Sequence, residues 1–176
     1  DGRAIKPDEE AGRAFRSKHG LSDGFVILYS GNLGLAHRFD SVCAAADKLS
    51  QEAPSVLFLF VGGGQRIAEV KTACSGLPNV RFMGYQPRET LNSLYNAADI
   101  HLVSLRDETA GMQVPSKYSA ALASGKPVLL VGGRNSDLCG EIQARQVGYA
   151  CGHDPEQIAG TILEAARDQS RTKQLG

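Results

Sequence analysis

Glycine-rich turns follow two apolar segments of this 176-residue sequence, and they favour the binding of an anion. The first turn, residues 30–34 (SGNLG), ends one apolar run, and the second, residues 62–65 (GGGQ), ends another. Glycines let backbone N–H groups approach a ligand closely, and the N-terminus of a following helix favours a negative charge such as a phosphate. The spacing differs from GxGxxG, so the dinucleotide fingerprint is absent. An ordinary glycine-rich turn is the alternative interpretation.

A long polar segment, residues 106–117 (RDETAGMQVPSK), leads into an expected helix over residues 117–124. Ser116 is a candidate N-cap for that helix, because its hydroxyl could accept a hydrogen bond from the first turn. Lys117 has the wrong sign for a helix N-terminus, where the helix dipole favours anions. A lysine at this place is useful if a bound phosphate lies between it and the helix end. A solvated lysine is the alternative.

Other residues that could take part in chemistry are isolated in the sequence. Residues 84–87 (GYQP) could offer an aromatic face and backbone groups to a nucleobase, or form a simple turn. His37 lies beside the first glycine turn, where a phosphate or sugar would bind, whereas His101 and His153 have no catalytic spacing and are expected to be structural. The four cysteines are scattered without a metal-ligand spacing, which predicts buried free thiols in a reducing compartment.

The elements that must position these residues alternate between strand-like and helix-like segments. The expected strands are residues 25–31, 55–62, 80–85, 100–105, 127–132 and, more weakly, 148–152; the expected helices are 39–49, 91–98, 117–124 and 158–167. Several strands are continuous apolar runs, as expected for parallel strands that are buried on both faces. The alternation predicts an α/β fold, a Rossmann-like, doubly wound parallel sheet of about six strands, in which ligands bind at the carboxyl ends of the strands.

The first 24 residues differ from the rest. Asp8 is a plausible N-cap for a helix over residues 9–19, with Gly20 as its stop, and the polar residues before it suggest a linker. The chain opens without Met and stops directly after a helical run, so we expect a piece of a longer protein, with residues 1–24 as linker and entry helix and 25–176 as one domain.

Charge and hydropathy narrow the possible partners. The 19 Lys and Arg residues balance the 19 Asp and Glu residues, which argues against a nucleic-acid partner because binding to nucleic acid usually needs a basic excess. No apolar run approaches the roughly 20 residues that span a bilayer. No secretory signal is visible at the start.

Taken together and in order, five motifs resemble the C-terminal half of a GT-B glycosyltransferase, within family 4 (group 1): YSGNLG, LFLFVGGG, NVRFMGYQPRETLNSLYNAADIHLVSL, VPSK and ASGKPVLL. The resemblance covers residues 25 to 166. It implies a domain that binds a nucleotide-sugar donor of the UDP or GDP type, in a retaining enzyme without metal or cofactor. It also implies a missing N-terminal domain that binds a lipid, polysaccharide or other acceptor. We expect a cytoplasmic protein, in which any attachment to the inner face of a membrane lies in the missing part.

The resemblance also implies which residues meet the donor. As donor-binding residues it suggests Gly31, Asn32, Gly34, Arg38, Gly62, Gly63, Tyr85, Gln86, Ser104, Gly111, Pro115 and Ser116. His37, Glu108 and Lys117 are the expected catalytic residues, with Lys117, Arg38 and the backbone amides of the first turn stabilising the leaving diphosphate.

The sequence departs from the family pattern at one place. Family 4 enzymes usually have a glutamate that holds the ribose hydroxyls, and this chain has Ala120 at that position. The second carboxylate of the usual pair lies eight residues earlier in the family, where this chain has Met112. Glu108 is a nearby candidate for a partial substitute. Two other readings therefore stay open: a degenerate domain that binds a nucleotide or a partner without catalysis, and half of a GT-B sugar-nucleotide epimerase, which would need carboxylates in the cleft between its domains.

Overall fold

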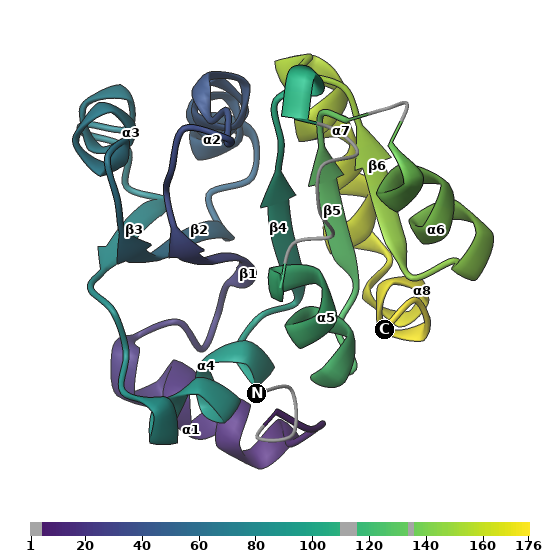
Figure 1. Ribbon diagram of the computed structural model, residues 1–176. Coiled ribbons are helices and arrows are strands. Elements are labelled where there is room, and N and C mark those ends of the chain that lie inside the picture. The colour runs from purple at the N-terminus through teal and green to yellow at the C-terminus, as the bar shows by residue number, and fades with distance from the viewer. Residues whose placement is uncertain (1–4, 110–115, 134–135) are drawn as a thin grey trace.

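The computed structural model describes residues 5–109, 116–133 and 136–176, which form a three-layer α/β domain (Figure 1). Six parallel strands pair in the order β3-β2-β1-β4-β5-β6. Their bounds are β1 Phe25–Asn32, β2 Val56–Gly63, β3 Val80–Met83, β4 Ile100–Ser104, β5 Val128–Val131 and β6 Gly148–Cys151. The predicted doubly wound parallel sheet is confirmed. Its strand order reverses between β1 and β4, the place where such sheets bind ligands.

Helices cover both faces of the sheet. One face carries α2 (Asp40–Glu52), α3 (Ile67–Ala73) and α7 (Pro155–Arg167), at the top of Figure 1; the other carries α1 (Glu9–His19), α4 (Leu91–Asn96), α5 (Ser116–Ala123) and α6 (Asp137–Arg145). Short helices at Arg88–Thr90 (η1), Asp107–Thr109 (η2) and Gln169–Gln174 (α8) complete the described elements. The sequence did not predict α3, α6 or α8. Two of them have at most seven residues, too few to show a helical period clearly.

Alternating side chains of β1 explain why its sequence is continuously apolar. Val26 and Leu28 pack toward α1 and α4, whereas Ile27 and Tyr29 pack toward α2 and α7. All four are almost completely buried. Because both faces are covered, the strand has no polar side to show in its sequence.

Helix ends follow the sequence signals with small differences. The Asp8 carboxylate caps α1 by accepting a hydrogen bond from the Ala11 N–H at 3.0 Å, and Gly20 ends that helix with a left-handed φ of 64°, both as predicted. Ser116 is the first residue of α5, so the prediction that it is the N-cap was one residue late. The segment preceding it, residues 110–115, lies outside the described residues.

The segment before α1 packs against α4. The buried Asn96 amide donates a hydrogen bond to the Lys6 carbonyl at 2.8 Å and accepts one from the Asp8 N–H at 2.8 Å. Gly12 lies so close that a Cβ there would be 2.4 Å from the Asn96 carbonyl oxygen. The described part of residues 1–24 is thus fixed to the domain; its role as a linker stays a prediction.

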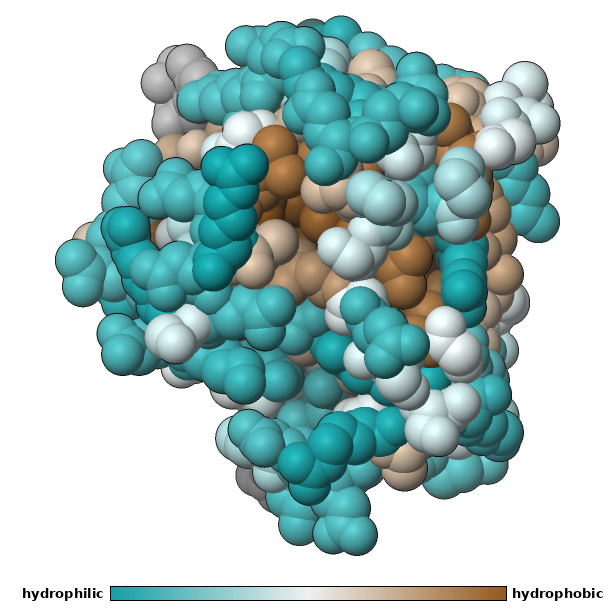
Figure 2. Space-filling model, turned by 180° about the vertical axis from the view of Figure 1, so that it is seen from behind, coloured by the Kyte–Doolittle hydropathy of each residue, from teal (hydrophilic) through white to brown (hydrophobic). Residues whose placement is uncertain are grey.

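Among the described residues, Leu35 and Tyr85 are the large apolar side chains that are exposed. The face opposite to the view of Figure 1 has apolar side chains gathered toward the middle and polar ones around them (Figure 2). All four cysteines are buried and free, as expected. Within the described ranges, no helix combines the length and the apolar character needed to cross a membrane.

The buried His101 on β4 predicts a loss of stability in acid. Its Nε2–H donates to the Tyr95 carbonyl at 3.1 Å and its ring stacks on Tyr95, while burial, helped by the charge of Lys126, lowers the pKa of His101 to about 3. In the unfolded chain the pKa is near 6.5, so the unfolded state binds the proton first. The neutral, buried His101 therefore contributes fully to the free energy of unfolding above about pH 6.5, and this contribution is lost as the pH falls toward 3. We expect the free energy of unfolding to drop by about 2 kcal/mol between pH 7 and pH 5.

The measurement is urea unfolding at both pH values for the wild type and for His101→Gln, whose amide can still donate to the Tyr95 carbonyl. The variant should show a flatter pH profile. An equally steep profile in His101→Gln would mean that other groups cause the acid sensitivity.

Candidate functional site

A cavity of about 680 Å³ opens at the carboxyl ends of β1 and β2, beside the point where the strand order reverses. We call it the lysine pocket, after Lys117. It is lined by Ile5, Ser30, Gly31, Asn32, Val61, Tyr85, Gln86, Arg88, Leu91, Tyr95, Ser116, Lys117, Ser119 and Ala120. The turn after β1, the loop after β3 and the first turn of α5 therefore meet here, as the predicted sheet edge requires.

The two glycine turns serve different purposes. β1 and β2 pair in register to their ends, with Gly31 opposite Gly62. Gly62 has a φ of 129°, and a Cβ there would lie 2.2 Å from the Gly31 carbonyl oxygen. Gly62 thus lets the two strand ends approach each other. At Gly31 a Cβ would lie 2.8 Å from the Lys117 Cε, so this glycine makes room for the lysine side chain.

Lys117 lies in a half-buried position on this glycine floor. Its Nζ is 5.0 Å from the centroid of the Tyr29 ring, a cation–π arrangement, and 3.4 Å from the His37 Nε2. Burial lowers the pKa of Lys117 below its ordinary value. The ammonium group is therefore partly desolvated, which strengthens its interaction with an anion in the pocket.

His37 joins the lysine pocket to the end of β4. Its Nδ1 is 2.6 Å from the Ser104 carbonyl oxygen, and its own carbonyl accepts hydrogen bonds from Arg66 at 2.9 Å and from Arg106 at 3.5 Å. Burial, followed by the charge of Lys117, lowers the pKa of His37, although the Ser104 carbonyl opposes the shift. Lys117 and His37 are 80 residues apart in sequence and in contact in the structure.

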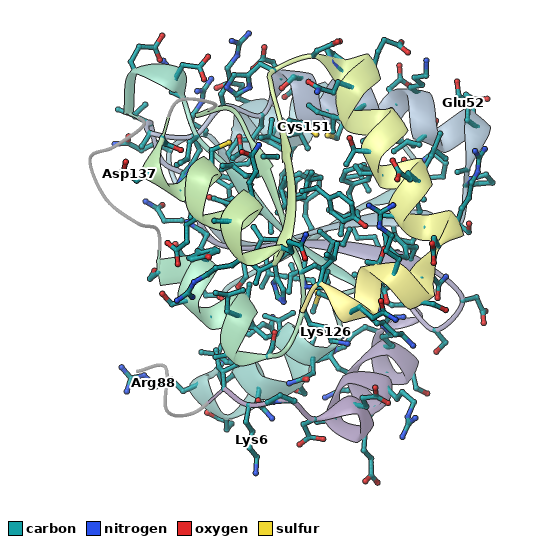
Figure 3. The ribbon with its side chains drawn as sticks, turned by 90° about the vertical axis from the view of Figure 1, so that its right-hand side faces the viewer. Lys6, Glu52, Arg88, Lys126, Asp137 and Cys151 are labelled. Carbon is teal, nitrogen blue, oxygen red and sulfur yellow. The ribbon has the colours of Figure 1, made fainter. Side chains whose placement is uncertain are left out.

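Aromatic and amide groups form the outer rim of the lysine pocket. Tyr85 is 67% exposed, and a Cβ on Gly63 would be 3.2 Å from its ring, so the glycine lets the ring lie against the end of β2. Gln86 follows it, and Arg88 extends away from the body of the molecule (Figure 3). Such a flat, exposed ring beside an amide can take a nucleobase by stacking.

Two of the predicted residues line a different cavity. Arg38 and Glu108 belong to a cavity of about 310 Å³ on the side of α2 and α3, which we call the arginine pocket; its other lining residues are Asp40, Arg66, Glu69, Arg106 and Asp107. Arg38 binds the Asp40 carboxylate with two nitrogens at 2.8 and 2.9 Å. This pairing holds the pKa of Asp40 below its ordinary value. The structure therefore does not bring Arg38 or Glu108 next to Lys117.

The remaining predicted residues fall into three groups. Ser116 and Asn32 line the lysine pocket, and Gly34 lies just outside its lining, where a Cβ would be 3.0 Å from the Asn32 side-chain nitrogen. Ser104 is completely buried and donates its hydroxyl to the Arg38 carbonyl, so it shapes the site from beneath. Gly111 and Pro115, with Met112, lie outside the described residues.

The sequence reasoning missed Tyr29 beneath the lysine pocket and Ser119 on its lining. Tyr29 is nearly buried and forms part of the floor under Lys117, with its hydroxyl donated to the Asn32 carbonyl at 2.8 Å. Ser119 and Ala120 line the lysine pocket together with Ser116. The spacing of three and four residues along α5 could have predicted that these side chains share one face.

The arrangement can bind a phosphate-containing ligand of elongated shape. It offers a cation, the N-terminus of α5 and a glycine turn at one end, and an exposed aromatic ring at the other. Among the described residues there is no group of three His, Cys, Asp or Glu side chains that could hold a metal ion.

Two relatives that are named as glycosyltransferases match most of this chain. WcaI of Escherichia coli K12, named as a colanic acid biosynthesis glycosyl transferase, is 30% identical over 150 residues, which are 85% of this chain and 37% of that protein. A GDP-mannose-dependent phosphatidylinositol monomannoside mannosyltransferase of Mycolicibacterium smegmatis is 26% identical over 177 residues, which are 97% of this chain and 46% of that protein. The chain thus spans less than half of the length of these relatives.

Solved structures share the fold. Anabaena HepE in complex with UDP-glucose superposes with a TM-score of 0.79 at 20% identity, over 99% of this chain and 48% of that one. The C-terminal domain of a glycosyl transferase group 1 family protein from Francisella tularensis gives a TM-score of 0.74 at 16% identity, over 99% of this chain and 91% of that one. The architecture is therefore that of the C-terminal domain of a GT-B glycosyltransferase.

The family model described as "Glycosyl transferases group 1" matches residues 24–168, which include every strand and the whole described lining of the lysine pocket except Ile5. The chain belongs to the glycosyl transferases group 1 family.

Proposed function

We propose that the lysine pocket binds the nucleoside diphosphate of a sugar donor, and that the whole protein transfers the sugar, with retention of configuration, to a lipid, polysaccharide or other acceptor. The observation that carries the proposal is the half-buried Lys117 in the first turn of α5, which lies against the glycine turn after β1 at the switch point of the sheet. The structure of HepE in complex with UDP-glucose supports a donor of the same kind.

The proposed mechanism assigns one part of the donor to each part of the pocket. The base stacks near Tyr85 and Gln86, and the ribose lies along the α5 face with Ser116 and Ser119. The diphosphate meets Lys117, the N-terminus of α5 and the Gly31 turn. When the bond from the sugar to the diphosphate breaks, negative charge grows on the leaving oxygens. A fixed, partly desolvated cation and fixed N–H groups stabilise that charge without having to rearrange.

The acceptor side of the reaction lies elsewhere in this proposal. Among the residues described, the lysine pocket has no carboxylate that could handle the acceptor proton. The named relatives are more than twice as long as the matched segment. We therefore propose that the isolated chain binds donor without turnover, and that an acceptor-binding domain outside it completes the site at the cytoplasmic side of a membrane.

A second candidate function is supported by Ala120. This residue lines the lysine pocket at the position where the family pattern has a ribose-binding glutamate, so a domain that binds nucleotide without catalysis is the alternative. Turnover of a nucleotide sugar by the full-length protein would exclude it. A parent protein that binds donor but neither transfers nor hydrolyses it would support it.

Titration of this chain with UDP, GDP and ADP tests the proposal. We expect at least one of them to bind with a dissociation constant near 0.1 mM, about −5.5 kcal/mol, as measured by calorimetry. The matching nucleoside should bind more weakly, because it lacks the diphosphate that meets Lys117. If none of the three binds at millimolar concentrations, the proposed donor site is wrong.

A further inference from the structure

The hydrogen-bond partners of His37 fix which of its ring nitrogens carries a proton. The Ser104 carbonyl oxygen lies 2.6 Å from Nδ1, and a carbonyl oxygen only accepts hydrogen bonds. Nδ1 must therefore be the N–H donor. In the neutral ring the other nitrogen, Nε2, then has a free lone pair, and this nitrogen faces the Lys117 ammonium at 3.4 Å.

The surroundings of His37 favour the neutral ring. Three cations face this residue: Lys117 at the ring, and Arg66 and Arg106 at its backbone carbonyl. The ring centroids of Tyr29 and Phe39 lie 5.7 and 6.0 Å from the centroid of the imidazole, and these rings exclude water from that side of His37. The lowered pKa of His37, caused first by burial, agrees with this arrangement.

We propose that His37 is a positioning residue that holds the Lys117 ammonium over Gly31, ready for the donor diphosphate, by accepting a hydrogen bond at Nε2. This inference rests on the proposed function of the lysine pocket and adds a role for a residue that was expected to be catalytic. Ser104 locks the ring orientation, and Lys117 is the group that meets the ligand.

The flexibility of lysine explains why such a holder is useful. A lysine side chain has four rotatable bonds, and fixing it on ligand binding costs entropy. The Gly31 floor and the Tyr29 ring limit the stem of Lys117 without specifying where its charged end points. The His37 Nε2 supplies the directional contact. Loss of this contact should weaken diphosphate binding by about tenfold, the order expected for freeing one lysine side chain.

Two substitutions separate this role from simple packing. In His37→Gln the side-chain oxygen can take the place of Nε2 and accept from Lys117. In His37→Asn the shorter amide can still donate to the Ser104 carbonyl but ends before Lys117. Affinities for UDP, GDP and their nucleosides are measured by calorimetry. We expect His37→Asn to lose about tenfold in affinity for the diphosphate that the wild type binds, with the nucleoside unchanged, and His37→Gln to stay within about threefold.

A double-mutant cycle tests whether His37 acts through Lys117. In a Lys117→Met background, His37→Asn should cause no further loss of diphosphate affinity, because the residue it positions is gone. The ¹⁵N chemical shifts of the wild-type imidazole should report the neutral Nδ1–H form at pH 7. Thermal unfolding of each variant confirms that it is folded.

The outcomes distinguish the positioning role of His37 from the proposed donor site. If the wild type binds UDP or GDP and the cycle is additive, or the ring is the Nε2–H form, the positioning role is wrong while the donor site stands. Equal losses in His37→Asn and His37→Gln, extending to the nucleoside, would likewise reduce His37 to a packing residue. If the wild type binds no nucleoside diphosphate, the proposed function and this inference both fall.

Discussion

Lys117→Met is expected to weaken the binding of UDP or GDP by about 30- to 100-fold while the matching nucleoside loses less than about threefold. Hydrogen bonds that involve a charged group contribute about 1.5–3 kcal/mol, and the partial burial of the Lys117 ammonium places it at the upper part of that range. The effect should be confined to ligands with a diphosphate. Calorimetry with the diphosphate and the nucleoside gives both numbers in one series.

Methionine is the informative replacement because it keeps most of the apolar stem. The stem of Lys117 lies against Gly31 and its charged end lies over the Tyr29 ring. Alanine would open a void there and mix a packing effect into the measured affinity. Met fills a similar volume and removes only the charge.

A matched control comes from the other end of the strands. Lys126, labelled in Figure 3, precedes β5 and is also half-buried. Burial also lowers the pKa of Lys126. Lys126→Met removes one positive charge from the chain without touching the lysine pocket, so diphosphate affinity should stay within about twofold of the wild type. If both variants lose affinity equally, or if Lys117→Met weakens nucleoside as much as diphosphate, Lys117 does not contact the phosphates.

The sequence predicted the features that depend on one segment at a time. Strand positions followed from apolar runs, and the ends of α1 followed from Asp8 and Gly20. The meeting of Gly31 and Lys117 could also be expected, because in a parallel sheet all turns that follow the strands gather at one edge.

Features that depend on side-chain direction could not be predicted. Arg38 follows His37 directly, yet its side chain turns to Asp40 in the arginine pocket while the His37 ring turns to Lys117. Glu108 is separated from Lys117 in the same way. Neighbours in an irregular turn point in directions that no period describes, so their assignment to one cavity or the other needs the three-dimensional structure.

Gly62 shows how the two kinds of information combine. The sequence places it at the end of β2 and leaves two interpretations open, a tight glycine-rich turn or a ligand that passes close by. The structure shows that Gly62 and Gly31 of the neighbouring strand come together, while contact of Gly62 with a donor stays a prediction. Gly62 therefore shapes the lysine pocket indirectly, by letting Gly31 lie where the Lys117 stem can rest on it.

Gly62→Ala is accordingly expected to lower the free energy of unfolding by about 3 kcal/mol. A non-glycine residue at a φ of 129° is strained, which costs on the order of 1–3 kcal/mol, and the new methyl group would stand 2.2 Å from the Gly31 carbonyl oxygen. Relief of that clash must move the end of β1, which adds roughly 1–3 kcal/mol of overpacking. The shift of Gly31 also displaces the floor beneath Lys117, so diphosphate affinity should fall in the variant even where it is fully folded.

Gly84→Ala is the matched control, because a Cβ there meets nothing within 4 Å and the backbone has no positive φ. Its unfolding free energy should change by less than about 0.5 kcal/mol. Thermal unfolding should separate the two variants by about 10 °C for a domain of this size. If Gly62→Ala instead unfolds at the same temperature as Gly84→Ala, the ends of β1 and β2 tolerate a side chain between them. The close approach of Gly31 and Gly62 would then not be what positions Lys117.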